Sequence, residues 1–324
     1  MDRLVLITGA TGYIGSVLTP IVAKRYAVRA FDTETFGNSI ADTSNVEFVK
    51  GDVRDIVAVH KALEGVTDVI HLAAIVTDDL VAMNEALGRE VNNDAFYVLC
   101  SAAVDQGVQR VIYASSSSVY GSQLGPCTEE STPAPLTEYA WTKLRGEYIV
   151  NEFQDRMTVC SIRCATACGP APRMRLDTVV NIFCKQAYFD HKITVYGGDQ
   201  WRTNIHVSDI ADLYLYMLDA PAEKINGQAF NATRLNSTVL SIAQKVRDKC
   251  RCPIEVLAAM TDHRSYMMTA RKLYDVFGWL PPRSIESAIT DNLRFFREGR
   301  VDNPDSDLFY NTRRMSEFVK QESV

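Results

Sequence analysis

No apolar run in the sequence is long enough to span a membrane. A membrane-spanning helix needs about 20 mostly apolar residues. The first residues, MDRLVLITGATG, also lack the basic and apolar stretches of a cleavable secretory signal. We therefore expect a cytoplasmic protein that has no membrane partner.

The chain also lacks an excess of positive charge. Its 34 Lys and Arg residues are outnumbered by 40 Asp and Glu residues, which gives a formal net charge of −6. Nucleic acids and anionic membrane surfaces attract basic proteins, so neither is an expected partner. A few local arginines would still suffice to bind a small anionic substrate.

Metal-binding patterns are missing as well. The five histidines and eight cysteines include no Cys-x-x-Cys pair. Cys160, Cys164 and Cys168 are evenly spaced, but they lie across a predicted strand and the following loop, where a metal would need further ligands. We predict no metal site and expect the thiols to serve as small apolar residues in a reducing compartment.

What the sequence does contain is a regular alternation of strands and helices in its first half. The predicted strands are 4–8, 28–32, 46–52, 68–74, 110–116 and 158–164, and the predicted helices are 13–25, 55–65, 92–106 and 137–155. Continuous apolar strands separated by helices indicate a parallel sheet covered on both faces. The predicted fold is therefore α/β, with a doubly wound parallel sheet of the Rossmann type.

The pattern becomes irregular after Gly169-Pro170. We expect a Rossmann domain over residues 1–168 and a smaller α/β substrate-binding lobe over 169–300, with part of the chain crossing back to the first sheet. The last predicted helix is 284–298, and residues 301–324 are predicted to form a polar tail.

A glycine-rich turn follows the first predicted strand. Gly9, Gly12 and Gly15 form a G-x-x-G-x-x-G pattern between a strand and a helix, where glycine lets the backbone approach a pyrophosphate and the helix N-terminus offers free N–H groups. Asp32 ends the second strand, about 20 residues on, where a carboxylate can accept hydrogen bonds from the adenosine ribose. Because that carboxylate would repel a 2′-phosphate, the pattern favours NAD over NADP.

A second pattern suggests acid–base chemistry. Tyr139 and Lys143 are four residues apart and lie on one face of a predicted helix. A neighbouring ammonium favours the phenolate, which could remove a proton from a hydroxyl. Four consecutive serines, 115–118, end a buried strand at the sheet edge where ligands bind in open α/β folds. A Tyr and a Lys at this spacing are common on solvated helices. Their combination with the four serines is what indicates an acid–base site.

These motifs resemble the extended short-chain dehydrogenase/reductase family, in the UDP-glucose 4-epimerase-like branch of NAD-dependent epimerases and dehydratases that act on nucleotide sugars. The matching segments are GATGYIG with Asp32, Gly51-Asp52-Val53, His71-Leu72-Ala73-Ala74, the serines followed by Val119-Tyr120-Gly121, Tyr139-x-x-x-Lys143 and Gly278-Trp279-Leu280-Pro281. The resemblance implies Ser116, Tyr139 and Lys143 as the catalytic group. It implies an NAD site formed by Gly9, Gly12, Tyr13, Ile14, Gly15, Asp32, Asp52, Val53, Leu72, Ala73, Ala74, Asn92, Tyr139 and Lys143.

The resemblance also implies a nucleotide-sugar site in the second half. Arg163-x-x-Thr166-x-x-Gly169-Pro170 is similar to a family segment in which Asn stands at the Thr position, and Arg202 begins an R-x-x-x-HVxD segment whose Arg holds the substrate diphosphate. His206 and Asp209 of that segment are expected to be structural. The expected substrate-binding residues are Ser116, Ser117, Thr166, Arg175, Asn181 and Arg202. A homodimer, formed in part by the Tyr139 helix, is expected by the same resemblance.

Three functions remain open at this point. Dehydratases and decarboxylases of the family carry acidic residues just after the catalytic Ser or Thr, where this chain has Ser117 and Ser118. Elimination needs a general acid and base that serine supplies poorly, so an epimerase is favoured. The alternatives are a nucleotide-sugar dehydrogenase/reductase or dehydratase and, from another class, a non-catalytic NAD-binding regulator. The presence of Ser116, Tyr139 and Lys143 disfavours the regulator.

Overall fold

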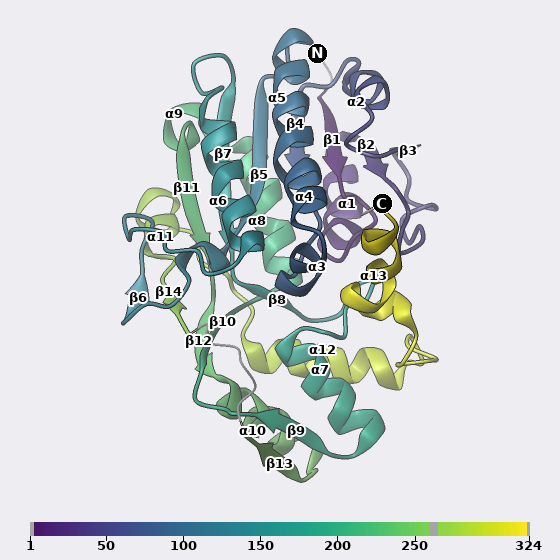
Figure 1. The fold of residues 1–324 in the computed structure, drawn as a ribbon, viewed down its shortest axis with the longest axis vertical. Coiled ribbons are helices and arrows are strands. Elements are labelled where there is room, and N and C mark those ends of the chain that lie inside the picture. The colour runs from purple at the N-terminus through teal and green to yellow at the C-terminus, as the bar shows by residue number, and fades with distance from the viewer. Residues whose placement is uncertain (1–2, 259–264, 323–324) are drawn as a thin grey trace.

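The protein is built on one parallel sheet of seven strands, in a computed structural model that describes residues 3–258 and 265–322 (Figure 1). The strand order is β11-β7-β5-β4-β1-β2-β3, and every neighbouring pair is parallel. The strands of this sheet are β1 (Leu4–Thr8), β2 (Ala27–Asp32), β3 (Val46–Lys50), β4 (Asp68–His71), β5 (Arg110–Ser116), β7 (Thr158–Cys164) and β11 (Gln228–Ala232). The order reverses direction between β1 and β4, so the predicted doubly wound α/β fold is confirmed.

Helices cover both faces of this sheet, as expected for strands that are apolar along their whole length. Helices α1 and α8 pack together on one face, and α2, α5 and α6 cover the other face. The bounds are α1 (Gly15–Ala23), α2 (Ile56–Leu63), α3 (Asp78–Met83), α4 (Glu85–Arg89), α5 (Ala95–Asp105), α6 (Glu138–Asn151), α8 (Val207–Asp219) and α9 (Ala222–Ile225), with a π-helical turn at Glu90–Asp94 and a 3-10 turn at Ser117–Tyr120.

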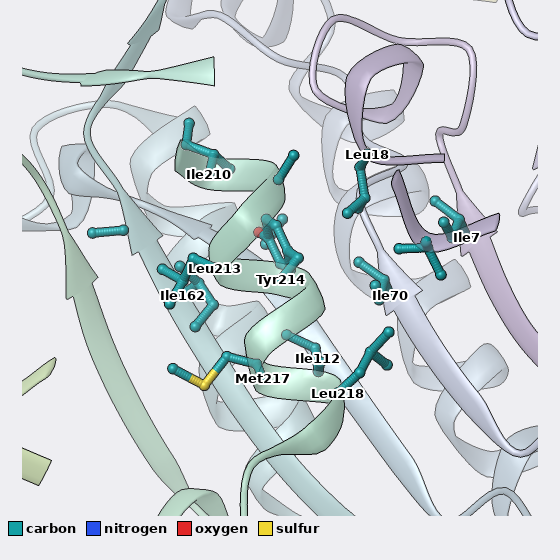
Figure 2. Packing of buried hydrophobic residues seen from close by; sticks show 14 of the residues in the cluster. Ile7, Leu18, Ile70, Ile112, Ile162, Ile210, Leu213, Tyr214, Met217 and Leu218 are labelled. Atoms are coloured by element: carbon teal, nitrogen blue, oxygen red, sulfur yellow. The ribbon is translucent and has the colours of Figure 1, made fainter. Parts of the chain in front are cut away.

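Helix α8 shows how this covering is achieved. Its inward side chains, among them Leu213 and Tyr214, lie over Ile162, Ile112 and Ile70 of three adjacent strands (Figure 2). Each is buried, and burying a large apolar side chain contributes about 1.5–3 kcal/mol. A helix from the second half of the chain is thereby fixed to the first sheet.

Many of the remaining elements, among them α7, β9, α10 and α12, form a second lobe with its own apolar core. Leu273 of α11 instead packs in the core of the seven-stranded sheet, and Cys127 of β6 and Met268 of β14 belong to a separate small cluster. The described residues also form three small sheets, in the orders β12-β10-β8, β13-β9 and β14-β6. Their strands are β6 (Pro126–Cys127), β8 (Thr166–Cys168), β9 (Ile193–Tyr196), β10 (Trp201–His206), β12 (Leu235–Thr238), β13 (Ile254–Leu257) and β14 (Met267–Met268). The helices are α7 (Val179–Lys185), α10 (Val239–Cys250), α11 (Arg271–Phe277) and α12 (Ile285–Arg297), with a π-helical turn at Gln186–Asp190.

The polar C-terminal segment does not remain an extended tail. After a 3-10 turn at Asp307–Phe309 it forms α13 (Asn311–Gln321), which packs against α3 beside the first sheet (Figure 1). Val319 of this helix is fully buried. No helix among the described residues is both long and apolar enough to cross a bilayer.

A buried ion pair fixes α6 to the sheet. Glu147 accepts hydrogen bonds from Arg163 Nε at 2.9 Å and Nη2 at 2.8 Å, and the two side chains are only 6 % and 7 % exposed. Ser115 donates a further hydrogen bond to Glu147, and Arg163 Nη1 donates to the Tyr120 hydroxyl at 2.8 Å. Because both charges are away from water, the removal of one partner leaves the other uncompensated.

We therefore expect Glu147→Ala to lower the free energy of unfolding by about 3–5 kcal/mol, measured by urea denaturation. The matched control is Asp275→Ala, which removes the exposed partner of Arg271 and should leave the unfolding midpoint unchanged. Equal losses of unfolding free energy in the two variants would contradict the conclusion that burial makes the Glu147–Arg163 pair important for stability.

Candidate active site

A cavity of about 850 Å³ lies at the carboxyl edge of the seven-stranded sheet. It is lined by the residues that follow β1, β2, β3, β4, β5 and β7, and by parts of the second lobe. The predicted site residues on its wall are Gly9, Gly12, Tyr13, Ile14, Gly15, Asp32, Asp52, Val53, Leu72, Ala73, Ala74, Ser116, Ser117, Tyr139, Lys143, Thr166, Arg175 and Arg202. The structure thus brings together segments that are far apart in the sequence.

The glycine turn at one end of the cavity is too tight for side chains. Gly9 has a positive φ of 70°, and a Cβ there would lie 2.7 Å from the Ala73 nitrogen. A Cβ on Gly15 would lie 2.3 Å from the Gly9 oxygen. The turn therefore requires glycine at both positions, and it brings bare backbone to the cavity wall at the start of α1.

Asp32 lies at the rim beside this turn. Its carboxylate accepts hydrogen bonds from the backbone N–H groups of Thr11 at 3.0 Å and Glu34 at 2.9 Å. These bonds hold the side chain at the end of β2, as expected for a group that receives a ribose hydroxyl.

The donors in this part of the cavity fit the pyrophosphate of NAD. No side chain caps the first turn of α1, and among the described backbone bonds the N–H groups of Tyr13 and Ile14 have no partner, so they remain available to an anion. The buried Arg173 lines the same wall, and its Nε has no partner within the described residues. Burial, together with the charge of Arg175, lowers the pKa of Arg173 to about 9, and a bound phosphate would stabilise its charged form.

Tyr139 and Lys143 lie one turn apart on α6, whose first turn is capped by Thr137. The Lys143 ammonium donates a hydrogen bond to the Ala114 carbonyl at 3.0 Å. Burial raises the pKa of Tyr139 to about 12, and the Ser116 hydroxyl acts in the opposite direction by hydrogen bonding to it. Burial lowers the pKa of Lys143 to about 8. Both side chains lie on the cavity wall, one helical turn apart.

The hydroxyls of the serine segment are ordered by one another. The Ser116 Oγ accepts hydrogen bonds from the Ser118 backbone at 3.2 Å and from its hydroxyl at 2.9 Å. Ser117 points elsewhere, with its Oγ 3.0 Å from the Tyr266 hydroxyl. The hydrogen bond between Ser116 and Tyr139 makes Ser116 the serine beside the phenol, whereas Ser117 contacts Tyr266.

Asn92 and Asn181 do not lie on the described cavity wall. The Asn92 amide bonds both backbone groups of Ile75 and the Thr142 hydroxyl. Asn181 is fully buried, accepts a hydrogen bond from the Gly169 N–H at 2.9 Å and donates one to the Tyr13 hydroxyl at 2.9 Å. Their amides are already used by the protein, so the geometry favours positioning roles and does not support the direct cofactor and substrate contacts expected of them.

The substrate-side residues are grouped on the wall formed by the second lobe. Thr166 is on β8 and Arg202 is on the neighbouring strand β10. Arg175 forms an ion pair with Asp177 at 2.5 Å. The basic side chains here suit an anionic ligand.

The two polar residues of the HVxD segment have structural contacts. His206 Nδ1 accepts the Ser208 N–H at 3.1 Å and so caps α8, and the buried Asp209 accepts a hydrogen bond from the Arg283 backbone at 3.0 Å.

Several wall residues were not expected from the sequence. Asp78 raises the pKa of Tyr139, and Tyr266 approaches from a distant segment. Thr312, Met315 and Phe318 come from α13. The described ranges contain no group of three His, Cys, Asp or Glu side chains arranged to hold a metal, and all eight cysteines are free thiols.

Comparison with known proteins identifies the family. A sequence model of the NAD dependent epimerase/dehydratase family matches residues 5–233. UDP-glucose 4-epimerase of Mycolicibacterium smegmatis is 28 % identical over 309 residues, which span 90 % of this chain and 98 % of the relative. The dTDP-D-glucose 4,6-dehydratase of Bos taurus is 25 % identical over 322 residues, 91 % of this chain and 89 % of the relative.

A solved structure extends the comparison to the whole fold. MoeE5 in complex with UDP-glucuronic acid and NAD has a TM-score of 0.81 and 26 % identity, covering 91 % of this chain and 99 % of that chain. The fold, the glycine turn and the sequence match agree, and the relatives include both epimerases and dehydratases. The chain belongs to the NAD-dependent epimerase/dehydratase family of extended short-chain dehydrogenases/reductases.

Proposed function

We propose that the protein is a nucleotide-sugar epimerase that oxidises a sugar hydroxyl transiently and reduces the resulting ketone from its opposite face. The observation that supports this is the arrangement at the end of β5, where Ser116 lies beside Tyr139 and is followed by two further serines instead of carboxylates. This group can move one proton to and from an oxygen, and epimerisation requires no more of the protein.

Each residue of the group has a separate role in this proposal. Tyr139 removes the hydroxyl proton and later returns it. Ser116 donates a hydrogen bond to the same sugar oxygen as it becomes a carbonyl. The hydrogen bond with Ser116 lowers the pKa of Tyr139 and so favours the phenolate, and Lys143, held by the Ala114 carbonyl, places an ammonium one helical turn away. NAD held at the glycine turn and Asp32 would supply the hydride acceptor for this oxidation.

A dehydratase is the second candidate, because one carboxylate lies near the phenol. Asp78 is on the cavity wall and its charge raises the pKa of Tyr139. It accepts a hydrogen bond from the Thr137 hydroxyl at the start of α6, which favours an anchoring role. The other carboxylates on the described wall are Asp32, Asp52, Asp79 and Asp177, and no glutamate is among the described wall residues.

The test is to incubate the purified protein with NAD and a panel of UDP- and dTDP-hexoses, with absorbance at 340 nm and NMR of the products. An inverted sugar without accumulation of NADH supports an epimerase. A product that has lost water identifies a dehydratase, and stoichiometric NADH identifies a dehydrogenase. Bound NAD without conversion of any sugar would contradict the proposed enzyme.

We expect Tyr139→Phe to lower turnover by about 10²–10⁴-fold, because the base is removed while the ring remains. NAD affinity should change little, as measured by fluorescence titration. Tyr148→Phe is the matched control, because it removes a hydroxyl from the exposed side of the same helix. Unchanged turnover in Tyr139→Phe would exclude this phenol as the base.

We expect Asp32→Asn to weaken NAD binding by about tenfold or more, because a charged acceptor for ribose hydroxyls is lost. NADP should be affected less, since the repulsion of its 2′-phosphate is relieved. The control is Asp42→Asn, which changes an exposed aspartate in the loop between β2 and β3. This variant should bind NAD as the wild type does. Isothermal titration calorimetry measures the affinities of the wild type and both variants for NAD and NADP. Equal losses of NAD and NADP affinity in Asp32→Asn would contradict this role of Asp32.

A homodimer formed through α5 and α6 is also part of the proposal. Three aromatic side chains on these helices are exposed, Tyr97 by 48 %, Trp141 by 42 % and Tyr148 by 57 %. Aromatic residues are enriched at protein interfaces.

Sedimentation velocity should therefore give about twice the chain mass of 36.2 kDa for the wild type. The Tyr97→Arg/Tyr148→Arg variant should sediment as a monomer, because two charges are placed in the interface. Tyr274→Arg alters an exposed tyrosine on α11 and should leave the dimer intact. A monomeric wild type would refute this interface.

A further inference from the structure

Helix α13 bridges the two halves of the molecule at the cofactor end of the cavity (Figure 1). Its first residue is tied to the second lobe. The Asn311 N–H donates a hydrogen bond to Asp177 Oδ2 at 2.9 Å, and Arg173 donates one to the Asn311 side chain. The Arg173 guanidinium lies 3.7 Å from the centre of the Phe36 ring, just after β2. This end of the helix is therefore fixed close to the predicted pyrophosphate and ribose sites.

The rest of α13 contacts the loops that follow β2 and β3 of the Rossmann sheet. Arg314 Nε donates a hydrogen bond to the Thr35 carbonyl at 2.8 Å. Arg54, whose guanidinium holds the Asp52 carboxylate, forms an ion pair with Glu322 at 2.8 Å. Between these contacts the buried Val319 joins the apolar core of the first sheet. The helix thus joins the segment of Arg173 and Asp177 to the loops that follow β2 and β3.

The inward face of α13 lines the cavity. Thr312, Met315 and Phe318 share the wall with Asp32 and Val53, at a spacing of three residues that places them on one side of a helix. Methionine and phenylalanine are suited to contacts with a flat aromatic group such as adenine. The C-terminal helix therefore forms part of the wall of the cavity that Asp32 also lines.

We propose that α13 is part of the NAD site and covers the adenosine end of the bound cofactor, so that NAD leaves only when the helix undocks. The inference rests on the NAD dependence of the family and on the position of Asp32, and it does not depend on which sugar reaction occurs. A cofactor retained in this way suits a reaction that regenerates NAD in place. A net dehydrogenase would instead need the helix to open in every turnover.

The rate of NAD release tests this proposal without any sugar. Val319→Asp places a charge at a fully buried position and should undock α13, whereas Lys320→Asp places the same charge at the neighbouring exposed position. Protein loaded with labelled NAD is chased with excess unlabelled NAD. We expect Val319→Asp to release NAD about tenfold faster or more, and Lys320→Asp to stay within about twofold of the wild type.

Hydrogen exchange followed by mass spectrometry keeps the test decisive if Val319→Asp fails to fold. In the wild type, NAD should slow amide exchange in residues 312–321 as well as in the glycine turn. Protection of the glycine turn alone would overturn the proposal. An unchanged release rate in a folded Val319→Asp variant whose α13 amides exchange freely would overturn it too. Neither the NAD release rate nor the hydrogen exchange of α13 requires a sugar. Both therefore test this proposal even if the epimerase assay fails.

Discussion

The docking of α6 on the ends of β5 and β7 is the contact on which the proposed chemistry depends. Lys143 is held by the Ala114 carbonyl of β5, and one turn further along the helix Glu147 is paired with Arg163 of β7 and bonded to Ser115. These contacts are buried, so they fix both the rotation and the height of the helix against the sheet. The position of Tyr139 relative to Ser116 follows from them.

The parallel sheet explains why a few contacts suffice to assemble the site. All strands end at the same edge, so residues from six loops reach one cavity without any long insertion. The tight turn at Gly9 and the carboxylate of Asp32 define one end of that cavity, and β8 and β10 of the second lobe define the other. Helix α8 joins the halves through the apolar core in Figure 2, and α13 joins them at the cavity rim.

The sequence allowed prediction of those features that depend on local backbone or on strand ends. The glycine turn, Asp32 and the pair on α6 could be located because each belongs to one strand–loop–helix unit. Asn181 could not be judged in this way, because its burial results from packing between segments distant in the chain. Helix α13 was expected to be a polar tail, since it has few apolar residues and its position depends on the tertiary contacts of Val319.

The most direct test of the account is the fate of the hydrogen on the oxidised sugar carbon. A nucleotide sugar deuterated at that carbon would be converted by the NAD-loaded protein in protonated water and its product analysed by NMR and mass spectrometry. The proposed epimerase should give an inverted sugar that keeps its deuterium at the same carbon. Loss of the deuterium to solvent, or a product lighter by one water, would contradict it.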